Sequence, residues 1–293
     1  MRIASCVTRD PLFAICRFAD LLTFARSISH RAAAILRPGV TGRVLASFER
    51  VCDLVTDAGE VAALVWGGIG NGPLNVVLDG RPGAALPAGS RFAVRECFLT
   101  VSDVTVDLAR AVLWDARPDW DVLRARRARV VAAAHAARSL SSGRQSGSLL
   151  KQAGPAVETA AAAFQGAWQR GERAGLEVAV RALCGLGPGL TPAGDDWLAG
   201  WLLAQHLGVV AARVREIADL IAEAAADRTT TLSRAFLACA AAGEADEDWH
   251  DLLQALTVGA YDRIENATQR ILGQGATSGA FMLAGFFIGI DVG

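Results

Sequence analysis

The sequence predicts an α+β fold, with a β-rich N-terminal domain followed by an all-helical C-terminal domain. Between residues 44 and 114, short apolar runs alternate with clusters of glycine and proline, a pattern typical of strands joined by turns. After Pro118 the apolar segments become longer and rich in alanine, which favours helices. Since the strands precede the helices instead of alternating with them, we expect segregated β and α parts and no βαβ units.

The predicted elements follow one another in a simple order. Strands are predicted at four apolar runs bounded by turn residues, namely Val61–Trp66, Leu74–Leu78, Phe92–Val94 and Phe98–Val101. A helix over Asp119–Arg138 and a serine- and glycine-rich loop or linker come next. Further helices are predicted at Ala156–Arg170, Leu176–Leu183, Pro192–Leu207, Ala211–Ala226, Leu232–Ala242 and Trp249–Ala260. We therefore expect a β-rich domain at residues 1–118, a helix and linker at 119–154, and a helical domain at 155–293.

Composition and charge argue against several classes of protein. The 293 residues carry 29 basic and 30 acidic side chains, and a net charge of -1 is untypical of a nucleic-acid-binding protein. Hydrophobic residues make up 52% of the chain and charged residues 20%, which excludes a disordered chain. No apolar run reaches the roughly 20 residues of a membrane span. The six cysteines form no CxxC pair, and the first residues lack the apolar stretch of a secretion signal, so we expect a cytoplasmic protein.

The most unusual segment is Cys184-Gly-Leu-Gly-Pro-Gly-Leu-Thr-Pro-Ala-Gly-Asp-Asp196. Thr191 followed by Pro192 predicts a helix start, with threonine as the N-cap and proline as the first helical residue. Alternating glycines before a helix N-terminus can turn their N–H groups toward an anion, so we predict that Gly187, Gly189 and Thr191 bind phosphate or carboxylate. The alternative is a tight turn without a ligand.

Two aspartates fall in the first turn of that helix. Asp195 and Asp196 are the predicted catalytic residues, which would orient a substrate amide or hold Mg²⁺, the one cofactor considered. The alternative is that they only stabilise the helix dipole, an effect worth roughly 0.3–1 kcal/mol.

A second glycine loop, Gly273–Gly279, leads into another small-residue helix. Its glycines, its threonine and a following Leu-Ala-Gly recur in the order of the first segment, which predicts an internal pseudo-repeat with both helix N-termini facing one cleft. Gly275, Thr277 and Ser278 are the ligand candidates here. The alternative is that Gly200 and Gly285, the glycines of the two Leu-Ala-Gly triplets, only allow close helix packing.

A third segment, Arg228-Thr-Thr-Thr-Leu-Ser-Arg234, places hydroxyls between two arginines at a predicted helix start. Arginine and hydroxyl groups together suit a carboxylate or phosphate, so Arg228, Thr230 and Ser233 are predicted to hold a second anion. The alternative is ordinary N-capping by threonine.

The segment Gly185–Gly200, the hydroxyl motif from Thr230 to Leu237 and the second loop up to Gly285 together carry a resemblance to a known family. They resemble the oxamate carbamoyltransferase subunit family, most strongly over Gly185–Gly289. The resemblance implies a subunit of a multi-protein enzyme of anaerobic allantoin degradation that exchanges carbamoyl between oxamate and phosphate. Its partners would include a subunit resembling acyl-CoA synthetases. Two positions depart from the family pattern, since histidine commonly stands at Gln274 and aspartate at Phe281.

We therefore expect a carbamoyltransferase subunit that binds a small anionic substrate, carbamoyl phosphate or a small carboxylate, at glycine-rich helix N-termini. Fixed hydrogen-bond donors suit this chemistry, because charge develops in its tetrahedral intermediate. One alternative is a non-catalytic partner or regulatory subunit that binds a small anion. Another is a Mg²⁺-dependent phosphate-ester or nucleotide enzyme. No nucleic-acid or membrane partner is expected.

Overall fold

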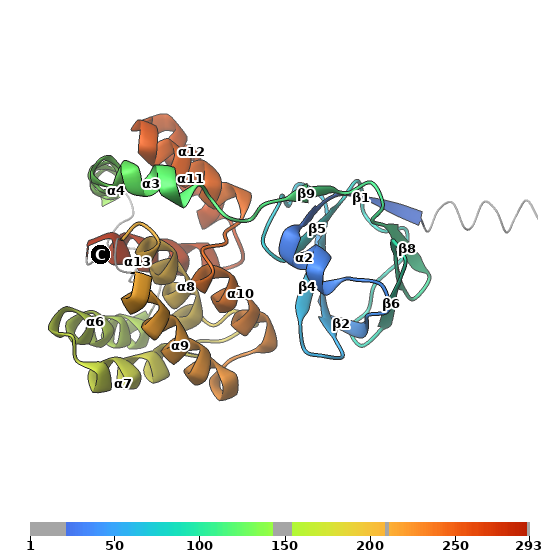
Figure 1. The fold of residues 1–293 in the computed structure, drawn as a ribbon, viewed down its shortest axis with the longest axis horizontal. Coiled ribbons are helices and arrows are strands. Elements are labelled where there is room, and N and C mark those ends of the chain that lie inside the picture. Colours follow the sequence, from blue (N-terminus) through green and yellow to red (C-terminus); the bar gives the residue numbers. More distant parts are fainter. Residues whose placement is uncertain (1–21, 143–153, 209–210, 292–293) are drawn as a thin grey trace, which may run out of the picture. The chain divides into compact units, whose positions relative to one another are not determined.

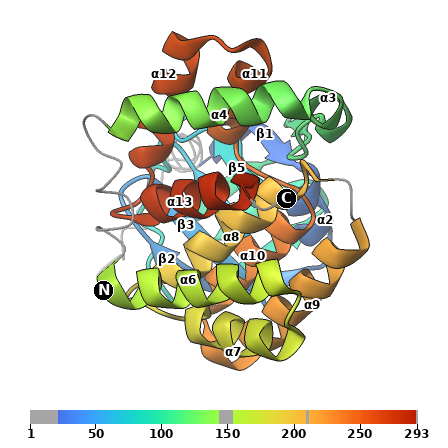
Figure 2. The same ribbon diagram turned by 90° about the vertical axis from the view of Figure 1, so that its left-hand side faces the viewer.

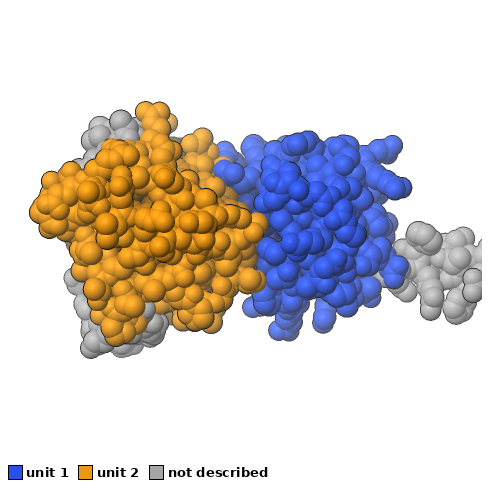
Figure 3. All heavy atoms as spheres, turned by 90° about the horizontal axis from the view of Figure 1, so that it is seen from below, with its two compact units in different colours: residues 1–115 blue, residues 116–293 orange. Residues whose placement is uncertain are grey.

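The structure, a computed structural model, describes residues 22–142, 154–208 and 211–291. The chain divides into two compact units, Met1–Asp115 and Ala116–Gly293, which Figure 3 shows in different colours. Each unit has its own hydrophobic core.

In the described part of the first unit, nine strands form one sheet, and eight of them close into a barrel (Figure 1). The ring runs β5-β4-β3-β2-β6-β7-β8-β1 and closes where β1 pairs antiparallel with β5. Strand β9 continues beside β1 in parallel, where β8 ends. The strands are β1 (Leu22–Ser29), β2 (Thr41–Ser47), β3 (Val51–Thr56), β4 (Val61–Val65), β5 (Asn75–Leu78), β6 (Arg91–Arg95), β7 (Phe98–Val101), β8 (Val104–Asp107) and β9 (Val112–Trp114).

Side chains from alternate positions of the strands fill the barrel interior. In β6 and β7, for example, every second residue is buried, and Phe92, Val94, Leu99 and Val101 all belong to the core of this unit. Successive residues of a strand point to opposite faces, so one face of each strand lines the interior.

This closure corrects the predicted fold class. The α+β prediction places no strand before residue 44, but β1 begins at Leu22 and is the strand that joins β8 to β5. The barrel also carries a helix, α2 (His30–Ile35), which the prediction lacks. β1 is difficult to predict from sequence, because its buried residues include the small Thr23, Ala25 and Ser27, whereas Leu22 and Phe24 are exposed. The fold is thus a closed β-barrel unit followed by a helical unit.

The described part of the second unit is helical. Its helices are α3 (Trp120–Ala125), α4 (Arg127–Ser142), α6 (Gly154–Arg170), α7 (Arg173–Leu183), α8 (Ala193–Gln205), α9 (Ala211–Arg228), α10 (Thr231–Ala241), α11 (Glu247–Val258), α12 (Tyr261–Leu272) and α13 (Ser278–Asp291). Helices α8 and α13 lie side by side at the centre, between α4 on one side and α6 on the other (Figure 2). Every residue of α8 is buried. None of the helices in the described residues is long and apolar enough to cross a membrane.

Glycines let the two central helices approach closely. A Cβ atom on Gly200 would lie 1.8 Å from the carbonyl oxygen of Met282, and one on Gly285 would lie 1.9 Å from that of Trp197. Both glycines of the Leu-Ala-Gly triplets therefore have a packing role. The N-termini of the two helices come together, since the hydroxyls of Thr191 and Ser278 meet at 2.9 Å, whereas the pseudo-repeat and the shared cleft stay predictions.

Candidate anion site at two helix N-termini

The first glycine loop joins α7 to α8 with three glycines of positive φ. The φ angles of Gly185, Gly187 and Gly189 are 73°, 117° and 99°, a conformation that other residues rarely adopt. Gly185 also has no space for a side chain, because a Cβ there would lie 2.0 Å from the carbonyl oxygen of Arg228. Gly187 and Gly189 are exposed, and their N–H groups have no acceptor among the described residues. These two N–H groups are therefore available to an anion.

Asp195 connects the glycine loop to the start of α10. Its Oδ1 accepts from the Gly185 N–H at 3.0 Å, and its Oδ2 accepts from the Ser233 hydroxyl at 2.8 Å and from the Thr229 hydroxyl. The side chain is 1% exposed. Both carboxylate oxygens of Asp195 thus have protein donors, and this residue holds two segments of the site together.

Asp196 is buried beside Asp195 but is differently bonded. Burial raises its pKa to about 7, the charge of Asp195 adds to the rise, and hydrogen bonds from Ser278 and Thr191 act in the opposite direction. The residue is 6% exposed, and its Oδ2 has no hydrogen-bond partner. A buried polar atom without a partner costs about 1–3 kcal/mol, so a ligand group that pairs with it gains that energy.

The second glycine loop meets the first through Ser278, the first residue of α13. The Ser278 hydroxyl contacts that of Thr191, so the N-termini of α8 and α13 converge. Gly275 (φ 61°) and Thr277 are exposed at this junction, and the Thr277 carbonyl accepts from the Phe281 N–H. A cluster of free N–H groups, hydroxyls and one unpaired carboxylate oxygen thus surrounds these two helix starts.

The hydroxyl segment before α10 also lies against the first loop. The Thr230 hydroxyl caps α10 by accepting from the Ser233 N–H at 3.0 Å and donates to the Leu190 carbonyl. Arg228 contacts the loop through its carbonyl group, and its side chain is exposed at the end of α9. Thr229, which the sequence prediction passed over within this hydroxyl run, is the threonine that contacts Asp195.

The structure therefore brings most of the predicted residues around the starts of α8, α10 and α13. The hydroxyls of Thr230 and Ser233 are used within the protein, and the guanidinium of Arg228 has no described partner at the site. Of the two positions that depart from the family pattern, Gln274 donates to Asp248 Oδ2 at 3.1 Å, and Phe281 is buried in the helical core.

Asp195 and Asp196 are the predicted ligands of a metal ion. In the part of the chain that the structure describes, no group of three or more His, Cys, Asp or Glu side chains could hold a metal ion. Since both oxygens of Asp195 have donors, Asp196 Oδ2 is the free carboxylate oxygen of the pair. Mg²⁺ binding by Asp195 and Asp196 stays a prediction.

Comparison with known proteins covers this same part of the chain. Residues 183–290 match the family model of the oxamate carbamoyltransferase subunit AllH. The predicted resemblance to this family is thus confirmed over the C-terminal part of the chain, from the end of α7 into α13, and the match includes both glycine loops and the hydroxyl segment. A search of curated proteins and a search of solved structures each gave no match.

Proposed function

We propose that the helical unit serves as a carbamoyltransferase subunit of the oxamate carbamoyltransferase type and binds its small anionic substrate at the N-termini of α8 and α13. The family match covers the segments that build this junction. The observation that carries the proposal is the free Oδ2 of Asp196, buried where two helix starts and two exposed glycine loops converge.

The substrates of such a reaction combine an anionic group with an amide. In our proposal the N–H groups of Gly187 and Gly189 receive the phosphate or carboxylate, assisted by the helix dipoles. The carbamoyl or oxamate NH₂ group donates to Asp196 Oδ2. One substrate thus satisfies both the free donors of the loop and the free acceptor beneath it.

Carbamoyl transfer then follows from the same placement. The amide nitrogen of oxamate attacks the carbamoyl carbon of carbamoyl phosphate, a C–N bond forms, and the C–O bond to phosphate breaks. The attacking nitrogen loses a proton. Asp196 is suited to accept it, since a general base is most effective when its pKa lies near the working pH and burial raises the pKa of Asp196 to about 7. Positioning of the two reactants supplies much of the remaining rate.

The family name describes its members as subunits, which supports the proposal that this chain has partner proteins. We propose that the active enzyme contains further subunits, one of them resembling acyl-CoA synthetases. Binding of substrate by this chain and turnover by the assembled enzyme are then separate properties.

Calorimetric titration of the full chain tests the proposal. Carbamoyl phosphate, oxamate and phosphate are titrated with and without Mg²⁺ into the wild type, Asp196→Asn and a matched control, Asp262→Asn. Asp262 is an exposed first-turn aspartate of α12, at the opposite end of this helix from the second glycine loop. We expect Asp196→Asn to weaken oxamate binding at least tenfold, about 1.4 kcal/mol, and Asp262→Asn to leave it unchanged. Equal binding of oxamate by both variants would refute the role of Asp196.

The same titrations test the predicted metal. If Mg²⁺ raises the affinity of the wild type for carbamoyl phosphate, and raises that of Asp196→Asn less, the result supports Mg²⁺ binding at Asp196.

A second candidate is a non-catalytic subunit that binds the same anion and regulates a partner. Two side chains favour this second candidate. Gln274 and Phe281 carry no titratable group, whereas the family commonly has histidine and aspartate at these positions. Oxamate binding without any carbamoyl transfer by the complete complex would favour this candidate over the catalytic one.

A further inference from the structure

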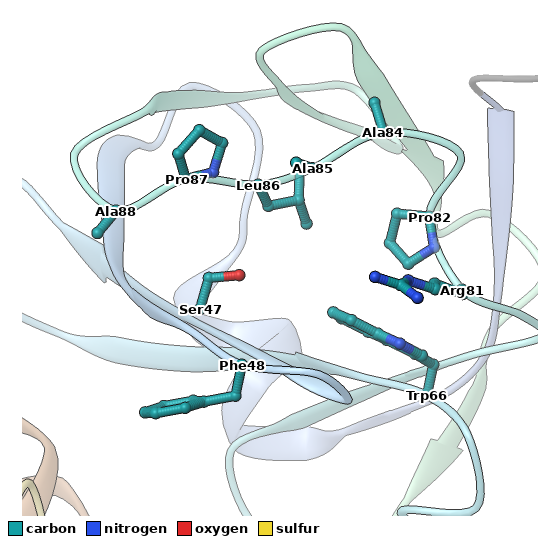
Figure 4. Close-up of a pocket in the computed structure, with 10 residues that line it drawn as sticks. All are labelled: Ser47, Phe48, Trp66, Arg81, Pro82, Ala84, Ala85, Leu86, Pro87 and Ala88. Atoms are coloured by element: carbon teal, nitrogen blue, oxygen red, sulfur yellow. The ribbon is translucent and has the colours of Figure 1, made fainter.

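The β-barrel unit contains a cavity of its own, distant in the sequence from the helix N-termini. The cavity has a volume of about 320 Å³, which is at the small end of the range of ligand pockets. It lies between the end of β2, Trp66 after β4 and the segment that joins β5 to β6 (Figure 4). Its lining residues are Ser47, Phe48, Trp66, Arg81, Pro82, Ala84, Ala85, Leu86, Pro87 and Ala88.

The sequence of the joining segment explains why space remains there. Residues 81–88 read Arg-Pro-Gly-Ala-Ala-Leu-Pro-Ala, so most of their side chains are small or are proline rings. Leu86 is 3% exposed and belongs to the barrel core, which anchors the segment. The prolines restrict its backbone. Small side chains over an anchored, stiff segment leave a cavity with an apolar wall.

The polar groups of the cavity are hydrogen-bond donors. Figure 4 shows the Arg81 guanidinium and the Trp66 indole reaching in from one side and the Ser47 hydroxyl from the opposite wall, whereas the Phe48 ring points away. Among the residues that the structure describes, no acidic side chain lines the cavity. Such a set of groups favours an anion over a cation.

Two of these donors lack partners. Arg91 is bonded to Asp57 and Arg50 to the Gly67 carbonyl, whereas Arg81, like Arg95, has no hydrogen bond or ion pair with the described residues. Trp66 is 6% exposed, and its Nε1 is buried without a partner. The Arg81 guanidinium can therefore pair with a bound anion without breaking a contact to the described protein.

We propose that this cavity binds a small carboxylate with an apolar body. The carboxylate pairs with the Arg81 guanidinium. The apolar body packs against the Trp66 ring, Leu86 and the proline and alanine side chains of the joining segment. The barrel would thereby be a ligand-binding unit in its own right, independent of the anion site in the helical unit.

Calorimetric titration of the full chain with isovalerate tests the proposal, with isovaleramide as the uncharged analogue and acetate as the analogue without an apolar body. We expect isovalerate to bind, isovaleramide to bind at least tenfold more weakly, and acetate several-fold more weakly, since each buried CH₂ contributes to affinity. Arg81→Gln should weaken isovalerate binding at least tenfold.

Two controls make the result specific. Arg95→Gln removes another exposed arginine of the barrel and should leave isovalerate affinity unchanged, as should Asp196→Asn in the helical unit. Arg81 is exposed, so Arg81→Gln is expected to fold. The proposal is overturned if the wild type does not bind isovalerate at millimolar concentration, if it binds isovaleramide equally well, or if Arg81→Gln binds isovalerate as the wild type does.

Discussion

Replacing Asp196 by asparagine should change how the stability of the protein depends on pH. Burial raises the pKa of Asp196 from 3.8 to about 7. A shift of about three units at 1.36 kcal/mol per unit corresponds to about 4 kcal/mol between the ionised and neutral forms. This is a large fraction of the roughly 5–15 kcal/mol by which proteins are stable.

The sign of the effect follows from proton binding. The folded state holds the Asp196 proton more tightly than the unfolded state, so this contribution is complete below about pH 4 and is lost as the pH rises through about 7. Asparagine cannot ionise and keeps the neutral form at every pH. We therefore expect Asp196→Asn to match the wild type near pH 4 and to exceed it in free energy of unfolding by up to about 4 kcal/mol near pH 8.

Urea unfolding followed by the helical circular-dichroism signal measures this difference at a series of pH values. The difference between variant and wild type is the relevant quantity, since other buried groups, such as Asp246 with a pKa raised to about 6, are common to both. Asp262→Asn is the matched control and should follow the wild-type curve. A difference between Asp196→Asn and the wild type that stays constant from about pH 4 to pH 8 would show that the pKa of Asp196 is not raised by folding.

Two further predictions concern packing and hydrogen bonding in the helical unit. Gly200→Ala should destabilise the protein by about 1–3 kcal/mol or more, because its Cβ would meet the Met282 carbonyl oxygen. Gly80 lies in open space, so the control Gly80→Ala should change thermal stability little. Unaltered unfolding of Gly200→Ala would contradict the close packing of α8 and α13. Ser233→Ala should lower the free energy of unfolding in urea by about 1–3 kcal/mol, because it removes a hydrogen-bond donor from the buried Asp195 carboxylate. An unchanged free energy of unfolding would show that Asp195 does not depend on this bond.

The sequence predicts local structure well where the signal lies within a few neighbouring residues. Thr230 caps α10, as a hydroxyl at a helix start suggests. The start of α8 differs in detail, because α8 begins at Ala193 with Pro192 at the N-cap position, and the Thr191 hydroxyl contacts Ser278 instead of capping the helix. That contact joins residues 87 positions apart and could not be predicted from local pattern.

Most of the features that could not be predicted depend on contacts between residues far apart in the sequence. Barrel closure depends on the pairing of β1 with β5, and β1 has small or polar residues at inward positions. The two adjacent aspartates look alike in sequence, yet partners from distant segments bond Asp195 and leave Asp196 Oδ2 free. Helix α12 is absent from the predicted helices, although Ile264, Ala267 and Ile271 are buried at helical spacing.

Amide hydrogen exchange of the full chain with and without oxamate is the most direct test of anion binding at the two helix N-termini, because it reports where the ligand contacts the backbone. We expect slower exchange in the two glycine loops, residues 185–191 and 273–279, and a smaller change in Asp196→Asn. The N–H groups of Gly187 and Gly189, which lack acceptors in the described structure, should be among those protected. Unchanged exchange in both loops, or protection confined to other segments, would contradict the account.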